Sequence, residues 1–224
     1  MKRVWSPETA TKAFLDTVKT CKLFNETSVA ELISSMAGGW NAKLIVETWE
    51  QGGMMTTSIG LAIASHHTGG RHVCIVADEA TKLEYMQAME KAGKSPEVIV
   101  GEPTEETMKD LKGIDFMVVD CKINDFARVF GVAKLGERGA VLMCKNAFTK
   151  IGSDFRWHNV LDGKSRIVRT AFLPVGDGLD IAYVGASSGT PKRSRSKWIK
   201  HINKETREEF LVRIVMKEHA NPTP

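Results

Sequence analysis

The chain has 224 residues, of which 42% are hydrophobic and 26% are charged, and its formal net charge is +4. This composition is typical of a globular protein and excludes an intrinsically disordered one. No apolar run approaches the roughly 20 residues of a membrane helix, and the N-terminus carries no secretory signal pattern. The sequence therefore predicts a cytoplasmic protein without a membrane partner.

The four cysteines, Cys21, Cys74, Cys121 and Cys144, form no CxxC pair, and two of them stand inside apolar runs. Spaced cysteines of this kind are more typical of buried reduced thiols than of disulfides or a zinc site.

The positive charge is concentrated in residues 192–201, from Lys192 to His201. A basic run of this kind is usually a solvated loop, although it can also contact an anionic partner or act as a nuclear address. Only Trp198 interleaves with the charges, which is too little for a base-stacking surface. Nucleic-acid binding through this run is therefore the least favoured interpretation.

The first part of the chain predicts two helices. Ser6 followed by Pro7 is a typical helix start. A second helix is predicted over 28–36, because Ser28 and Glu31 match a capping box and two glycines follow the helix.

Strands and helices then alternate. Strands are predicted at 43–48, 72–77, 97–100, 114–119 and 140–144, and helices at 56–66, 79–92, 105–111 and 125–135. Strands with continuous apolar character between helices predict a parallel sheet covered on both faces.

The alternation ends in two β-like runs, 166–173 and 179–184, joined by only five residues. A connection this short requires an antiparallel hairpin. The sequence thus predicts an α/β fold with a doubly wound, mostly parallel seven-stranded sheet and an antiparallel terminal hairpin. We expect this domain to span 1–187 and a basic C-terminal extension to span 188–224, in which 208–217 fits either a helix or an added edge strand.

Several segments resemble the cation-dependent O-methyltransferases of the caffeoyl-CoA and catechol type. They are LPVGDGL at 173–179, NAK at 41–43, EKAG at 90–93 and IDFMVVD at 114–120. The similarity runs in order from about Val29 to Val184. The whole chain also resembles a plant family of methyltransferase-like proteins. The resemblance implies a Rossmann-like class I methyltransferase fold, S-adenosyl-L-methionine (SAM) as cofactor and a small-molecule substrate, and it leaves a homodimer open.

The resemblance assigns the turn after the first strand to SAM. Glu47 stands at the family's acidic position and Gly53 at its later glycine, after Gly52. Trp49 replaces the family's first glycine, where an indole could occupy the space of the methionine part of SAM. The alternative is that the two glycines merely make a sharp turn.

The resemblance also places the rest of SAM after the second and third strands. Asp78, or the adjacent Glu79, could accept hydrogen bonds from the ribose, although Asp78 suits a helix cap equally well. Glu102 is expected near the adenine.

In the related enzymes an aspartate after strand four and an Asp-Asn pair after strand five bind a divalent cation. Asp120 matches the first aspartate and Asn146 the asparagine, but Lys145 replaces the second aspartate. An ammonium there repels a cation, so we expect no catalytic metal. Lys145 could instead stabilise a substrate oxyanion or act as a base, or it could form a plain ion pair with Asp120. Lys122 lies nearby in the motif.

Three functions remain open. The first is metal-independent methylation of a small-molecule hydroxyl, with Asp120, Lys145 and Asn146 near the substrate and Asp120 also near SAM. The second is an inactive methyltransferase fold that serves as a binding or regulatory module. The third and least favoured is a nucleic-acid-binding module. The histidines His66, His67 and His72 flank a loop and are expected at the surface.

Overall fold

The computed structural model describes residues 5–22, 29–150, 155–161 and 165–186, together with the backbone of 196–202 and 209–215. The chain divides into two compact units, Met1–Ser187 and Ser188–Pro224, which are described separately. Ser28, the expected cap of the second helix, and the side chains of the basic run at 192–201 lie outside the described residues. A separate function for residues 188–224 stays a prediction.

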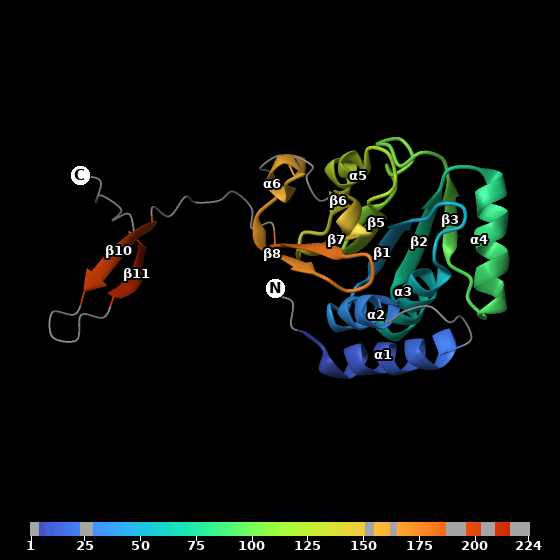
Figure 1. Cartoon of the computed structure of the whole chain (residues 1–224), viewed down its shortest axis with the longest axis horizontal. Coiled ribbons are helices and arrows are strands. Elements are labelled where there is room, and N and C mark those ends of the chain that lie inside the picture. The colour runs from blue at the N-terminus through green and yellow to red at the C-terminus, as the bar shows by residue number, and fades with distance from the viewer. Residues whose placement is uncertain are drawn as a thin grey trace, which may run out of the picture. The chain divides into compact units, whose positions relative to one another are not determined.

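A seven-stranded sheet forms the framework of the first unit, with the strand order β3-β2-β1-β5-β7-β9-β8 (Figure 1). The strands are β1 (Leu44–Thr48), β2 (Arg71–Val76), β3 (Glu97–Val100), β5 (Phe116–Asp120), β7 (Ala140–Lys145), β8 (Ile167–Leu173) and β9 (Leu179–Val184). The first five pair in parallel, whereas β9 runs antiparallel to both β7 and β8. The predicted sheet with its terminal hairpin is confirmed, and its strand order reverses between β1 and β5.

Helices cover the centre of the sheet, and the strands β1, β5 and β7 are therefore buried on both faces. The helices are α1 (Pro7–Cys21), α2 (Val29–Gly39), α3 (Met55–Thr68), α4 (Glu79–Lys91), α5 (Phe126–Val132), α6 (Trp157–Val160) and the 3-10 helix η2 (Ala147–Lys150). Alternate residues of a strand face opposite sides, so Val46 and Met117 pack in one core cluster, and Ile45 and Phe116 in another. Burial on both faces explains why these strands read as continuous apolar runs.

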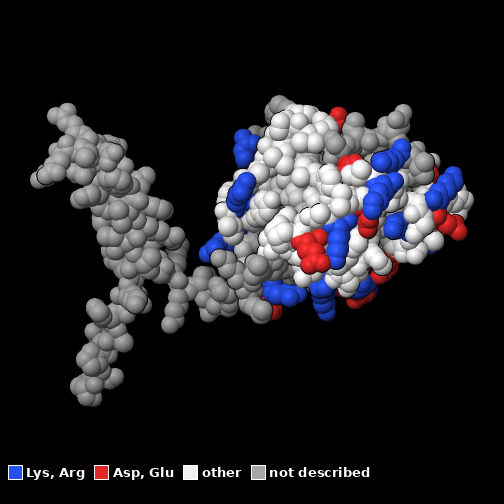
Figure 2. All heavy atoms as spheres, turned by 90° about the horizontal axis from the view of Figure 1, so that it is seen from below, with Lys and Arg blue, Asp and Glu red and all other residues white. Residues whose placement is uncertain are grey.

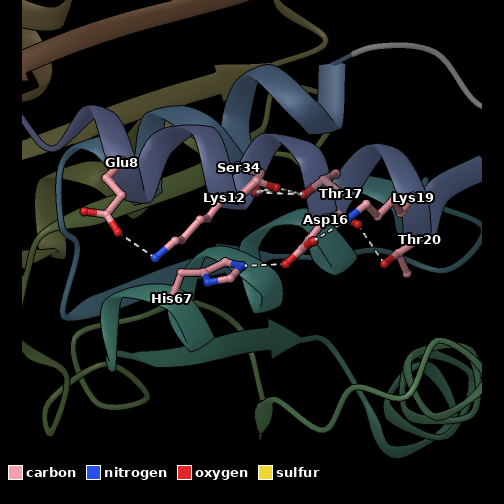
Figure 3. A network of polar contacts seen from close by, with 9 residues as sticks. Glu8, Lys12, Asp16, Thr17, Lys19, Thr20, Ser34 and His67 are labelled. Atoms are coloured by element: carbon pink, nitrogen blue, oxygen red, sulfur yellow. Dashed lines mark hydrogen bonds and ion pairs between the residues drawn. The ribbon is translucent and has the colours of Figure 1, made fainter.

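Polar contacts link α1 to the helices α2 and α3 (Figure 3). Ser6 caps the helix as predicted. The buried Thr17 hydroxyl hydrogen-bonds to Ser34 Oγ of α2 at 2.8 Å, and Asp16 Oδ2 lies 2.9 Å from His67 Nε2 of α3. The hydrogen bond to His67 contributes most to lowering the pKa of Asp16. These contacts join three helices on one side of the sheet.

Two predictions for the chain after β3 are wrong: one helix does not form, and another ends earlier than expected. The expected helix at 105–111 is a series of turns, because a segment this short gains too few hydrogen bonds to offset the cost of starting a helix. Helix α5 ends at Val132, and the next residues form a short strand β6 (Lys134–Leu135) that pairs in parallel with β4 (Lys112–Ile114).

The second unit contains a hairpin of its own. Strand β10 (Ser196–Ile202) pairs antiparallel with β11 (Glu209–Val215) in a two-stranded sheet. Of the two alternatives at 208–217 the strand is therefore correct, but its partner is β10 and it does not extend the main sheet.

All four cysteines are buried thiols, as predicted. No helix of the described residues is both long and apolar enough to span a membrane. On the face that carries α1, Lys and Arg side chains alternate with Asp and Glu (Figure 2). This face lacks the single-sign basic surface that binds nucleic acid.

Candidate functional site

A pocket of about 350 Å³ lies at the carboxyl ends of β1, β5 and β7. In open α/β sheets this is where ligands bind, beside the reversal of strand order, and the volume lies within the range of small-molecule sites. The pocket is lined by Val29, Glu50, Gln51, Gly52, Gly53, Met54, Thr57, Asp120, Lys122, Lys145, Asn146, Val175, Gly176, Asp177, Gly178 and Leu179.

The turn after β1 forms one wall of the pocket. The Gly53 N–H donates to the Glu50 carbonyl at 2.9 Å, and Gly52 adopts a φ of 73°, which favours glycine. No atom lies within 4 Å of the position that a Cβ would take at Gly52. Glu84, which belongs to α4, accepts the Gly52 N–H through its Oε1 at 3.2 Å. This hydrogen bond connects the turn to α4. The turn thus brings two residues without side chains to the pocket wall, while the N–H groups of both glycines are engaged within the protein.

The predicted trio of Asp120, Lys145 and Asn146 lies together in the pocket. Asp120 Oδ2 accepts a hydrogen bond from Asn146 Nδ2 at 2.7 Å and lies 3.7 Å from Lys145 Nζ. Asp120 Oδ1 accepts the backbone N–H of Lys122 at 2.9 Å. Asp120 and Lys145 are 8% and 6% exposed, respectively, so solvent screens their attraction only weakly. Parallel pairing of β5 with β7 sets Asp120 beside Lys145.

The donor set at this position does not fit a divalent cation. Magnesium prefers a cage of oxygen ligands, whereas here one carboxylate and one amide stand beside an ammonium that already neutralises Asp120. Nowhere among the described residues do three or more His, Cys, Asp or Glu side chains gather in a way that could hold a metal.

Glu47 does not line the pocket but lies fully buried in the core. Its Oε1 accepts the Tyr85 hydroxyl at 2.8 Å and lies 3.0 Å from His72 Nε2. Burial opposes ionisation of this carboxyl, but the hydrogen bond and charge of His72, together with the charge of Lys145, hold the pKa of Glu47 below its ordinary value. Burial and the Glu47 charge raise the pKa of Tyr85. The expectation that His72 is a surface group is wrong.

Asp78 and Glu102, the residues expected at the adenosine end of SAM, do not line the pocket either. Asp78 Oδ1 accepts the Thr81 N–H at 2.7 Å and caps α4. This bond lowers the pKa of the Asp78 carboxyl. Glu102 is exposed after β3. The helix-cap alternative for Asp78 is therefore realised, and ligand contacts of both residues stay predictions.

The Trp49 indole lies in the core and not in the pocket. It is 2% exposed and packs against Tyr85 with ring centroids 5.3 Å apart. A Cβ added to Gly53 would come within 2.9 Å of Trp49 Nε1, so a glycine is needed where the turn crosses the indole. Trp49 therefore fills space beneath the turn, between α3 and α4.

We expect Trp49→Ala to destabilise the protein without opening the pocket. Removing a large buried aromatic side chain costs about 3–5 kcal/mol, and this should appear in urea unfolding. SAM affinity of the fraction that remains folded should not increase. A gain in affinity without a loss of stability would mean that the indole blocks the ligand.

Sequence reasoning missed Glu50 and the hairpin turn before β9 as parts of the site. Gly176, Asp177 and Gly178 reach the pocket because β9 runs back beside β7. The LPVGDGL segment had marked this turn by resemblance only. Glu50 carried no signal in the sequence, because its place in the pocket depends on the course of the turn.

Comparison with known proteins identifies the family of this chain. The family described as "protein of unknown function (DUF1442)" matches residues 1–214. The chain belongs to this family. The comparison with curated proteins found no match.

Three solved structures that share this fold are methyltransferases. An O-methyltransferase, TomG from Streptomyces achromogenes, in complex with SAM, is 23% identical, with a TM-score of 0.56 over 78% of this chain and 90% of that one. A methyltransferase from Geobacter sulfurreducens is 21% identical, with a TM-score of 0.56 over 77% and 88% of the chains. A Bacillus cereus O-methyltransferase in complex with SAH is 17% identical, with a TM-score of 0.55 over 80% and 91%. This member of the DUF1442 family therefore has the Rossmann-like fold of SAM-dependent methyltransferases.

Proposed function

We propose that this protein is a SAM-dependent methyltransferase that methylates a hydroxyl group of a small molecule without a catalytic metal. The observation that carries the proposal is the pocket in which the glycine turn after β1 meets Asp120, Lys145 and Asn146. A binding turn and a charged cluster in one cavity are what a transferase needs, because one holds the donor while the other acts on the acceptor.

SAM, when bound, would supply a methyl group on a positively charged sulfonium. Because Gly52 and Gly53 line the pocket and carry no side chains, the methionine part could approach this turn closely. Asp120 would accept a hydrogen bond from the donor or from the acceptor, since it lies between the turn and β7.

Lys145 has the central role in this proposal. The attacking oxygen must release its proton to solvent and carry negative charge, which a nearby cation stabilises. Lys145 supplies a fixed ammonium at the position where the related enzymes are expected to place a metal, and Asp120 and Asn146 hold the network in place. Metal independence follows because the ammonium already balances the carboxylate.

Titration calorimetry of the full chain with SAM and with S-adenosylhomocysteine (SAH) tests the proposal. We expect saturable binding with a Kd of about 1–100 µM, in the range that small-molecule sites commonly reach. Purified, cooperatively folded protein that binds neither ligand would exclude the proposed function.

The second candidate function is a binding or regulatory module that has lost catalysis. It is favoured by two observations: Glu47 is enclosed in the core and Asp78 serves as a helix cap, so neither lines the pocket. Binding of SAM or SAH without methylation of any acceptor in a screen of hydroxyl-bearing compounds would support this module.

A further inference from the structure

Glu50 brings a further carboxylate to the pocket, and the proposed methyl transfer does not use it. It lies in the turn that would hold the methionine part of SAM, and it lines the same cavity as Asp120 and Lys145. Its side chain forms no hydrogen bond or ion pair within the part of the chain that the structure describes. The turn itself is fixed, because the Glu50 carbonyl accepts the Gly53 N–H at 2.9 Å.

The charges around Glu50 are mixed. Asp120 and Lys122 follow β5, Lys145 ends β7, and Glu102 follows β3. Partial burial and the negative charge of Asp120 raise the pKa of Glu50 above its ordinary value. Lys145 is paired with Asp120, and although Lys145 and Lys122 both attract the Glu50 carboxylate, neither forms an ion pair with it in the described part of the chain.

We propose that Glu50 is the residue by which this site selects the methyl donor, which carries a positive sulfonium, over the product, whose sulfur is neutral. The inference rests on the proposed function. SAM and SAH differ by one methyl group and by the positive charge of the sulfonium. A carboxylate near the sulfur attracts that charge in SAM, whereas the neutral thioether of SAH offers no charge there. The α-ammonium is common to both ligands and does not contribute to the preference. Product would then leave more readily after methyl transfer.

The selectivity depends on the protonation of Glu50. Above its pKa the carboxylate is ionised and favours the sulfonium, and below its pKa the neutral acid does not. The preference for SAM over SAH should therefore be largest above the pKa of Glu50 and fall as the pH is lowered through it. Sulfonium binding should in turn favour the ionised carboxylate, so that SAM releases a fraction of a proton when it binds at pH values near this pKa.

The test is calorimetric titration of wild-type protein and of Glu50→Gln with SAM and SAH between about pH 5 and about pH 8. Glu50→Gln should lower the affinity for SAM about 5- to 10-fold, as expected for one partly screened charge pair. Its affinity for SAH should stay within about twofold, which also shows that the variant is folded. The ratio of the two affinities should no longer change with pH.

Two control variants separate charge from turn geometry. Glu84→Gln weakens the contact that holds the turn to α4 but leaves Glu50 intact, and Glu106→Gln removes an exposed carboxylate outside the pocket. Both should keep the wild-type ratio of SAM to SAH affinity. If SAM binds the wild type and Glu50→Gln leaves this ratio unchanged, the inference is wrong while the proposed function stands. If neither ligand binds the wild type, both are wrong.

Discussion

Lys145→Asp should turn the pocket into a site that binds a divalent cation. The variant sets a second carboxylate beside Asp120 and Asn146, which completes the oxygen set expected in the related enzymes. Without metal, the lost ion pair and the repulsion between two carboxylates should destabilise the variant by about 2–4 kcal/mol. With Mn²⁺ at about 100 times its Kd, binding should return about 2.7 kcal/mol. A thermal melt would then show a metal-dependent rise of about 5–10 °C.

The wild type should show no such rise, and EDTA should reverse the effect in the variant. Lys122→Asp is a matched control, because it makes the same charge change in the same pocket but away from the strand end that holds Lys145. Adding Asp120→Asn to Lys145→Asp should abolish the metal response. Mn²⁺ that stabilises the wild type reversibly through Asp120 would overturn the proposal that Lys145 takes the place of the metal.

The sequence predicted the fold well because apolar periodicity and connection length are local signals. The five-residue connection before Leu179 required an antiparallel hairpin, and the sheet contains it. The helix at 105–111 failed because local propensity was too weak to decide a short segment. The resemblance to the O-methyltransferases predicted that Asp120, Lys145 and Asn146 meet. They do so because β5 and β7 pair in parallel and bring these side chains to one edge of the sheet.

The rest of the site depended on tertiary contacts. Glu47 lies near the end of the buried strand β1, where a ligand-binding residue could stand, but its side chain is buried in the core, where it contacts His72 and Tyr85. Nothing in the spacing of these residues shows the pairing, since β2 and α4 supply the partners. Trp49 was interpreted as an obstacle for the same reason: a sequence gives the size of a side chain and not its direction.

His72→Ala should be among the most destabilising single substitutions in this protein. Glu47 and His72 are both buried, with 0% and 2% of their side chains exposed, and they lie 3.0 Å apart. Removing one partner of a buried pair leaves an uncompensated charge and costs about 3–5 kcal/mol. Tyr85→Phe, which removes one hydrogen bond to the same carboxylate, should cost about 1–3 kcal/mol. Urea unfolding near pH 7 measures both, and His66→Ala on the exposed end of α3 should change stability by less than about 0.5 kcal/mol.

The buried Glu47–His72 pair should also make the free energy of unfolding depend on pH in a defined direction. The pKa of Glu47 is lowered in the folded protein, so its contribution is complete above the ordinary carboxyl pKa of 4.5 and is lost as the pH falls through the folded value. Wild type should therefore lose stability in acid faster than the double variant Glu47→Leu/His72→Leu, in which apolar groups replace the pair. Because the charge of Lys145 also lowers the Glu47 pKa, Lys145→Met should raise it and shift the acid transition to higher pH. A His72→Ala protein as stable as the wild type would show that Glu47 is neutral in the core and that the pocket lysine does not act on it.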